Sequence, residues 1–132
     1  MNLSVEKKLS LIAYNIEKAE TAINDTHFLI ENKKSYLAYN RIYYACFYII
    51  TALALKNDFS TSKHKQLIGW FNKNYVKENI VDKKYGKILN KAFDQRTESD
   101  YGTVLNPSVE EVLSLLEEVK EFVHVIKHLL TK

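Results

Sequence analysis

Glycine and proline are scarce in this sequence: three glycines and one proline occur in 132 residues. Average usage of these two residues would be about 12% of a chain, so tight turns are few. This argues against an all-β protein. Phosphate-binding loops of the Walker and Rossmann types need clustered glycines, and Gly69, Gly86 and Gly102 stand far apart. Nucleotide sites of those two types are therefore excluded.

Cysteine and long apolar runs are also lacking. The single cysteine, Cys46, excludes an internal disulfide and a zinc site built from several cysteines, and it fits a reducing cytosol. Glu6 and Lys7 interrupt the first apolar residues, so we expect no signal peptide. No stretch approaches the ~20 apolar residues of a membrane span. We therefore expect a cytoplasmic protein that does not contact a membrane.

Charge is nearly balanced, with a formal net charge of +3 and a pI of about 8.8. This mild excess of basic residues permits contact with RNA without predicting it. Hydrophobic residues make up 46% of the chain and charged residues 27%, which is ordinary for a folded domain. The length suits one hydrophobic core, so we expect a single domain over residues 1–132.

Apolar residues recur at helical spacing in five segments of the chain. The expected helices cover approximately residues 5–23, 35–55, 62–78, 82–93 and 108–130. A longer polar interruption over residues 94–107 separates the last two. Helices joined mostly by short loops predict an all-α fold, an antiparallel four- to five-helix up-and-down bundle.

Capping residues and glycines refine this expectation. The expected helix starts carry capping side chains, namely Thr61 or Ser62, Asp82, and Ser108 together with Glu111. Gly69 and Gly86 fall inside expected helices, where glycine costs about 1 kcal/mol relative to alanine. We therefore expect close helix contacts at both glycines.

The segment 35–55 is apolar on nearly every face, which predicts a central helix. A small bundle covers such a helix poorly, so we expect part of it to contact a second copy in a homodimer. Aromatic rings can stack on bases, but a stripe at helical spacing is more often core or interface. We expect a core or interface role for the tyrosines that gather here, which are Tyr36, Tyr39, Tyr43, Tyr44 and Tyr48.

Arginine is rare and lysine is common: of the 19 basic residues, Arg41 and Arg96 are the two arginines. Both lie on apolar helix stripes, as does His64. A buried charge needs a partner, and Asp100, four residues after Arg96, is the best placed of the nearby carboxylates, which include Asp94 and Glu98. One interpretation is an internal ion-pair network. The other is a polar cleft in which guanidinium groups hold phosphates and His64 moves a proton.

Three blocks of sequence resemble the HEPN family, named for a nucleotide-binding domain of higher eukaryotes and prokaryotes. They are the runs AYNRIYYACFYIITALAL, SKHKQLIGWFNKNYVK and ILNKAFDQRTESDYG, and the similarity is greatest to the small stand-alone branch called UPF0332. The resemblance implies a helical bundle that dimerises and, in many members, a toxin that cleaves RNA without a metal. It also implies a partner nucleotidyltransferase of the MNT type, which can add AMP to a tyrosine of the toxin.

The sequence departs from the family pattern at one important place. In active family members an arginine is followed after four to six residues by a histidine, and no histidine follows Arg96 or Arg41 at that distance. Arg96 matches the motif arginine, and His64 could supply the base from another helix. Asp100 and Tyr101 could instead orient Arg96; Tyr101 occupies the place where the family pattern puts the histidine.

Two functions remain open from the sequence. The first is a toxin-like HEPN protein with an RNA-binding or RNA-cleaving cleft built from Arg41, His64, Arg96 and Asp100. The second is a catalytically inactive helical dimer that binds a nucleotide or docks a nucleotidyltransferase. No cofactor is expected. No metal is expected either, because His124 and His128 have helical spacing for a metal but no third ligand in a recognisable motif.

Overall fold

The computed structural model describes residues 4–100 and 107–132. Helices are the only regular elements in those two ranges. The all-α class expected from the sequence is therefore confirmed. The elements in chain order are α1 (Val5–Glu31), η1 (Ser35–Leu37), α2 (Ala38–Lys56), α3 (His64–Phe71), η2 (Asn72–Val76), α4 (Lys83–Asp100) and α5 (Val109–Leu130).

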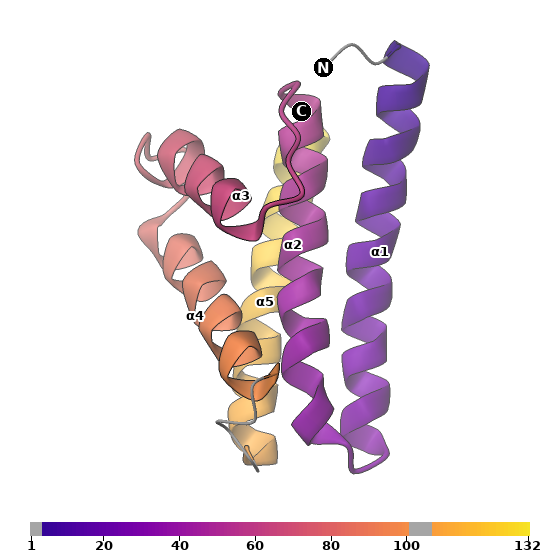
Figure 1. Ribbon diagram of the computed structural model, residues 1–132, viewed down its shortest axis with the longest axis vertical. Helices are drawn as coiled ribbons and strands as arrows, with labels where there is room; N and C mark the ends of the chain where they lie inside the picture. Colours follow the sequence, from indigo (N-terminus) through magenta and orange to yellow (C-terminus); the bar gives the residue numbers. More distant parts are fainter. Residues whose placement is uncertain (1–3, 101–106) are drawn as a thin grey trace.

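Helix α2 lies at the centre of the molecule, with α1, α4 and α5 packed around it (Figure 1). Twelve of its residues are buried, among them Tyr43, Ile49 and the single cysteine, Cys46. The chain's own helices thus cover most of the apolar surface of α2. A half-buried face remains on this helix, formed by Arg41, Tyr44, Phe47, Tyr48 and Thr51.

The polar interruption is shorter than expected. Residues 94–100, expected to interrupt the helices, continue α4 as far as Asp100. Arg96 and Asp100 therefore lie on one helix, four residues apart, where their side chains share a face. The sequence gives little sign of this because the last two turns of α4 carry mostly polar residues.

The helix starts agree with the expected caps in two places and differ in one. The Asp82 carboxylate accepts the Lys84 N–H at 2.9 Å, and the Ser108 hydroxyl accepts the Glu111 N–H at 3.1 Å. Helix α3 begins later than expected, after Lys63, whose N–H is accepted by the Thr61 hydroxyl. This later start makes His64 the first residue of α3.

A short π-helical turn, η2, continues α3 and packs against α4 at Gly86. A Cβ atom added at Gly86 would lie 3.0 Å from the Asn72 amide oxygen and 3.3 Å from Val76. The close contact expected at this glycine is confirmed. At Gly69 the same atom would meet nothing within 4 Å, so the expectation of close contact there is wrong.

These two glycines give a paired prediction about stability. We expect Gly69→Ala to raise the free energy of unfolding by about 0.5–1 kcal/mol, because alanine lowers the entropic cost of the helix and has room there. The increase in the free energy of unfolding should be smaller for Gly86→Ala, because Asn72 and Val76 must shift to make room for the added methyl group. Urea unfolding of both variants checks the order, and a larger gain at Gly86 would contradict it.

Across the described residues, no helix combines the length and apolar character that a membrane span requires.

Candidate functional site

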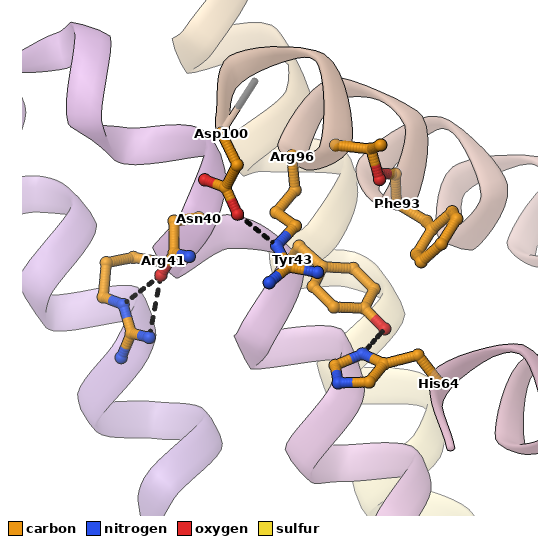
Figure 2. Close-up of polar contacts among 8 residues, drawn as sticks. Asn40, Arg41, Tyr43, His64, Phe93, Arg96 and Asp100 are labelled. Atoms are coloured by element: carbon orange, nitrogen blue, oxygen red, sulfur yellow. Dashed lines mark hydrogen bonds and ion pairs between the residues drawn. The ribbon is translucent and has the colours of Figure 1, made fainter. Parts of the chain in front are cut away.

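Three elements bring the expected site residues together. Helix α2 supplies Tyr43 and Tyr44, the first residue of α3 is His64, and the end of α4 carries Arg96 and Asp100. Figure 2 shows the imidazole and the Arg96 guanidinium both lying against the Tyr43 side chain. Residues separated by more than fifty positions in the sequence thus meet at one place.

His64 is held by aromatic side chains of α2. Its Nδ1 lies 2.6 Å from the Tyr43 hydroxyl oxygen, a hydrogen bond drawn in Figure 2. Its ring stacks on Phe47 with centroids 4.3 Å apart and meets the Tyr44 ring edge-on at 5.8 Å. Burial, followed by the positive charge of Arg96, lowers the pKa of His64 below its usual 6.5. The imidazole is therefore neutral at pH 7.

The hydrogen bond to Tyr43 can form with either tautomer of His64. In one, the Tyr43 hydroxyl donates to Nδ1 and the proton lies on Nε2. In the other, Nδ1–H donates to the Tyr43 oxygen and Nε2 keeps a free lone pair. Burial raises the pKa of the Tyr43 hydroxyl far above its ordinary value of 10, so the phenol stays protonated. Only the second tautomer can take a proton at Nε2.

Arg96 combines one ion pair with two aromatic contacts. Its Nε is 2.7 Å from the Asp100 Oδ2, which makes Asp100 its counter-charge, as the sequence predicts. The two atoms lack hydrogen-bond alignment, so Nε–H has no hydrogen-bond acceptor among the described residues. The guanidinium carbon lies 5.7 Å from the centre of the Tyr43 ring and 5.5 Å from that of Tyr44. The arginine is therefore held by α2 as well as by its own helix.

A cleft of about 540 Å³ opens beside these groups. Its lining residues come from α3 and α4 and are His64, Lys65, Phe93, Arg96, Thr97 and Asp100. Within the described ranges, three of the four residues expected to build one cleft thus share it. Two cations and a neutral imidazole face the same space, and Asp100 is the one carboxylate among the described lining residues. These groups suit an anionic ligand that also carries a proton for the imidazole to remove.

Arg41 lies outside that cleft. Its Nε and Nη2 donate to the Asn40 side-chain oxygen at 3.1 and 2.9 Å, as Figure 2 shows. It lines a smaller pocket of about 120 Å³ between α1 and α2. Its guanidinium carbon is 5.1 Å from the centre of the Tyr44 ring, so Arg41 and Arg96 both lie against the same ring. The internal ion-pair network expected as an alternative is not found among the described residues.

Tyr43 and Tyr44 are the members of the site that sequence reasoning missed. We expected both to be core or interface residues. Tyr44 is half-buried and contacts His64, Arg41 and Arg96. Its position three residues after Arg41 was the available signal, because residues at that spacing share a helix face. Two of the grouped tyrosines, Tyr39 and Tyr43, are buried as core residues.

Tyr101 was expected to orient Arg96, and no metal was expected at His124 and His128. Tyr101 lies outside the described residues. His124 and His128 are exposed on α5, and the described part of the chain contains no group of three His, Cys, Asp or Glu residues placed to hold a metal.

Comparison with known proteins places the chain in a family. Residues 12–129 match the HEPN domain. The chain belongs to the HEPN domain family. A UPF0332 protein of Thermotoga maritima is 33% identical over 96% of this chain and 96% of its own length. Two proteins of Methanocaldococcus jannaschii bear the name "putative toxin". One is 36% identical over 85% of this chain and 83% of its own, and the other 29% over 96% and 84%.

The family membership shows where this HEPN chain departs from its pattern. The histidine that the pattern places after the motif arginine is absent, and Asp100 pairs with Arg96 instead. A histidine is nevertheless present in the cleft of Arg96, brought there by α3.

Proposed function

We propose that this HEPN protein is toxin-like and cleaves RNA without a metal in the cleft of His64 and Arg96. The observation that carries the proposal is their common cleft, in which a neutral base and a fixed cation face the same space. Two relatives that bear the name "putative toxin" support the biological role. The neutral imidazole supports the chemistry, because a general base must be unprotonated at working pH.

The reaction assigns one role to each group. His64 Nε2 takes the proton of a ribose 2′-hydroxyl, and the oxygen attacks the adjacent phosphorus. A bond between O2′ and phosphorus forms while the bond to O5′ breaks, and O5′ receives a proton from solvent. Arg96 stabilises the negative charge that grows on the non-bridging phosphate oxygens. When Nδ1–H donates to the Tyr43 oxygen, the imidazole is in the tautomer that the step needs.

A second function is favoured by the ion pair of Arg96. Asp100 already neutralises the guanidinium, and in a catalytically inactive protein this pair would only shape a binding surface. Under this alternative the protein binds a nucleotide, or docks a nucleotidyltransferase of the MNT type, as a helical homodimer in the cytoplasm. The half-exposed aromatic side chains of α2 support an intermolecular contact.

Incubation of the purified protein with a ribonucleotide oligomer in EDTA tests the proposal. We expect fragments that end in a 2′,3′-cyclic phosphate, because the attacking oxygen is internal to the RNA. The same sequence made with 2′-O-methyl ribose should remain intact, since it has no proton to lose. If RNA stays intact, or is cut only with added metal, metal-independent cleavage is excluded. Thermal shifts with AMP or ATP would then test the nucleotide-binding alternative.

A further inference from the structure

Cations and aromatic rings alternate across a surface that begins at the cleft and continues over α2 to α1. We call this surface the cation–aromatic strip. It consists of Arg96, Tyr44, Arg41, Tyr48, Lys18 and Tyr14.

Ring contacts and one shared pocket join the members of the strip. Tyr44 lies beside both arginines and is 5.6 Å from Tyr48, measured between ring centres. The Lys18 ammonium is 4.5 Å from the centre of the Tyr48 ring and 5.1 Å from that of Tyr14. Arg41 and Lys18 line one pocket with Tyr48. The strip is therefore continuous from α4 to α1.

Two of the three cations in the strip have no carboxylate partner in the described part of the chain. The ion pairs found there include neither Lys18 nor Arg41. Lys18 lies over two rings although Glu17 is its neighbour and lines the same pocket. Cations held by aromatic faces keep their charge available for an anion. The strip thus offers positive charge at intervals between ring faces.

We infer that the cation–aromatic strip binds single-stranded RNA that leaves the cleft, with phosphates at Arg41 and Lys18 and bases stacked on Tyr44 and Tyr48. Positive charge that follows the backbone, together with rings that accept base faces, is the arrangement by which proteins bind single strands. A duplex fits poorly because its base faces are already stacked. The inference rests on the proposed function in one respect: cleavage in the cleft is what places one end of the bound strand there.

A second copy of this chain fits the strip less well. Two copies of the strip facing each other would each carry an excess of positive charge, since Glu17 is the one carboxylate beside the unpaired Arg41 and Lys18 in their described pocket, and this is unfavourable. The half-exposed tyrosines expected to form an interface therefore suit a polyanion better. A change of oligomeric state in the strip variants is the outcome that would favour the interface.

Fluorescence anisotropy with 2′-O-methyl oligonucleotides tests the strip apart from cleavage, because these strands bind without being cut. We expect affinity to rise with length from a dinucleotide to a strand that reaches α1. Tyr48→Leu should weaken binding of the longer strand about fivefold or more, and Tyr48→Phe should restore it, because stacking needs the ring. Lys18→Gln should lower the slope of log affinity against log salt by about 0.7, as for one lost phosphate contact.

Two charge variants sharpen this test. Glu17→Gln should tighten binding of the longer strand and leave the dinucleotide unchanged, because this carboxylate repels the far phosphates only. Lys7→Gln and Glu31→Gln are matched controls, exposed on the same helix and outside the strip, and should change little.

Three outcomes would overturn the inference: affinity independent of length, strip variants that bind like the wild type, or strip variants that change the oligomeric state in sedimentation. Failure of the strip is distinguishable from failure of the proposed function. If unmodified RNA is cut while the strip variants bind normally, only the strip is wrong. If the strip variants lose binding but RNA is never cut, only the cleavage proposal is wrong.

Discussion

Arg96→Ala is expected to lower the rate of RNA cleavage about 100-fold or more and to abolish growth inhibition in cells that express the protein. The guanidinium is the group placed to stabilise charge on the phosphate, and loss of one such donor typically costs about 10²–10³ in rate. Arg96→Lys should restore little, because an ammonium cannot replace the planar guanidinium in its stacked position. Cleavage assays and colony counts measure the two effects.

A matched control for this prediction lies on the same helix. Lys87 is exposed on α4 and lines neither the cleft nor the strip, so Lys87→Ala removes one positive charge without touching the site. Circular dichroism should show both variants folded. If Arg96→Ala remained as toxic as the wild type while folded, the guanidinium would have no part in the activity.

His64→Gln is expected to lower the cleavage rate by about two to four orders of magnitude, the usual contribution of a general base. Glutamine keeps a polar side chain near Tyr43 but cannot take a proton. His124→Gln is the control, since that histidine is exposed on α5. An unchanged rate in His64→Gln would remove the imidazole from the mechanism and require another general base.

The same histidine sets the direction of the pH dependence. Burial and Arg96 lower its pKa in the folded protein below the ordinary 6.5. The folded state therefore binds fewer protons than the unfolded chain, and stability falls as pH decreases below about 6.5 and through the folded pKa. Cleavage should fall over the same acid range. Urea unfolding and rate profiles check both effects, and His64→Gln should lose this part of the pH dependence of stability.

The fold was accessible from the sequence because it depends on local signals. Helical periodicity, the caps at Asp82 and Ser108, and the rarity of glycine and proline were sufficient for the all-α class. The end of α4 was only partly accessible. Arg96 continues the apolar stripe, but the polar residues after Phe93 were expected to interrupt the helices.

The candidate site was predictable in its charged residues and its histidine, but not in its tyrosines or its geometry. Rarity of arginine pointed to Arg41 and Arg96, and position on an apolar stripe pointed to His64. Their relation depends on how α3 and α4 pack on α2, which no spacing encodes. The sequence therefore could not show that Tyr43 bonds His64, or that Tyr44 separates the two arginines.

The packing of α4 has a consequence for how the site works. Its five buried residues all lie between Tyr85 and Ala92, so the two turns that carry Arg96 and Asp100 add none. Helix ends with few buried contacts fray at little free-energy cost. The contacts of Arg96 with Tyr43 and Tyr44 therefore tie this end of α4 to α2 in place of buried apolar residues. A phosphate held by this guanidinium would favour the helical state, and part of the binding energy would be spent on ordering the end of α4.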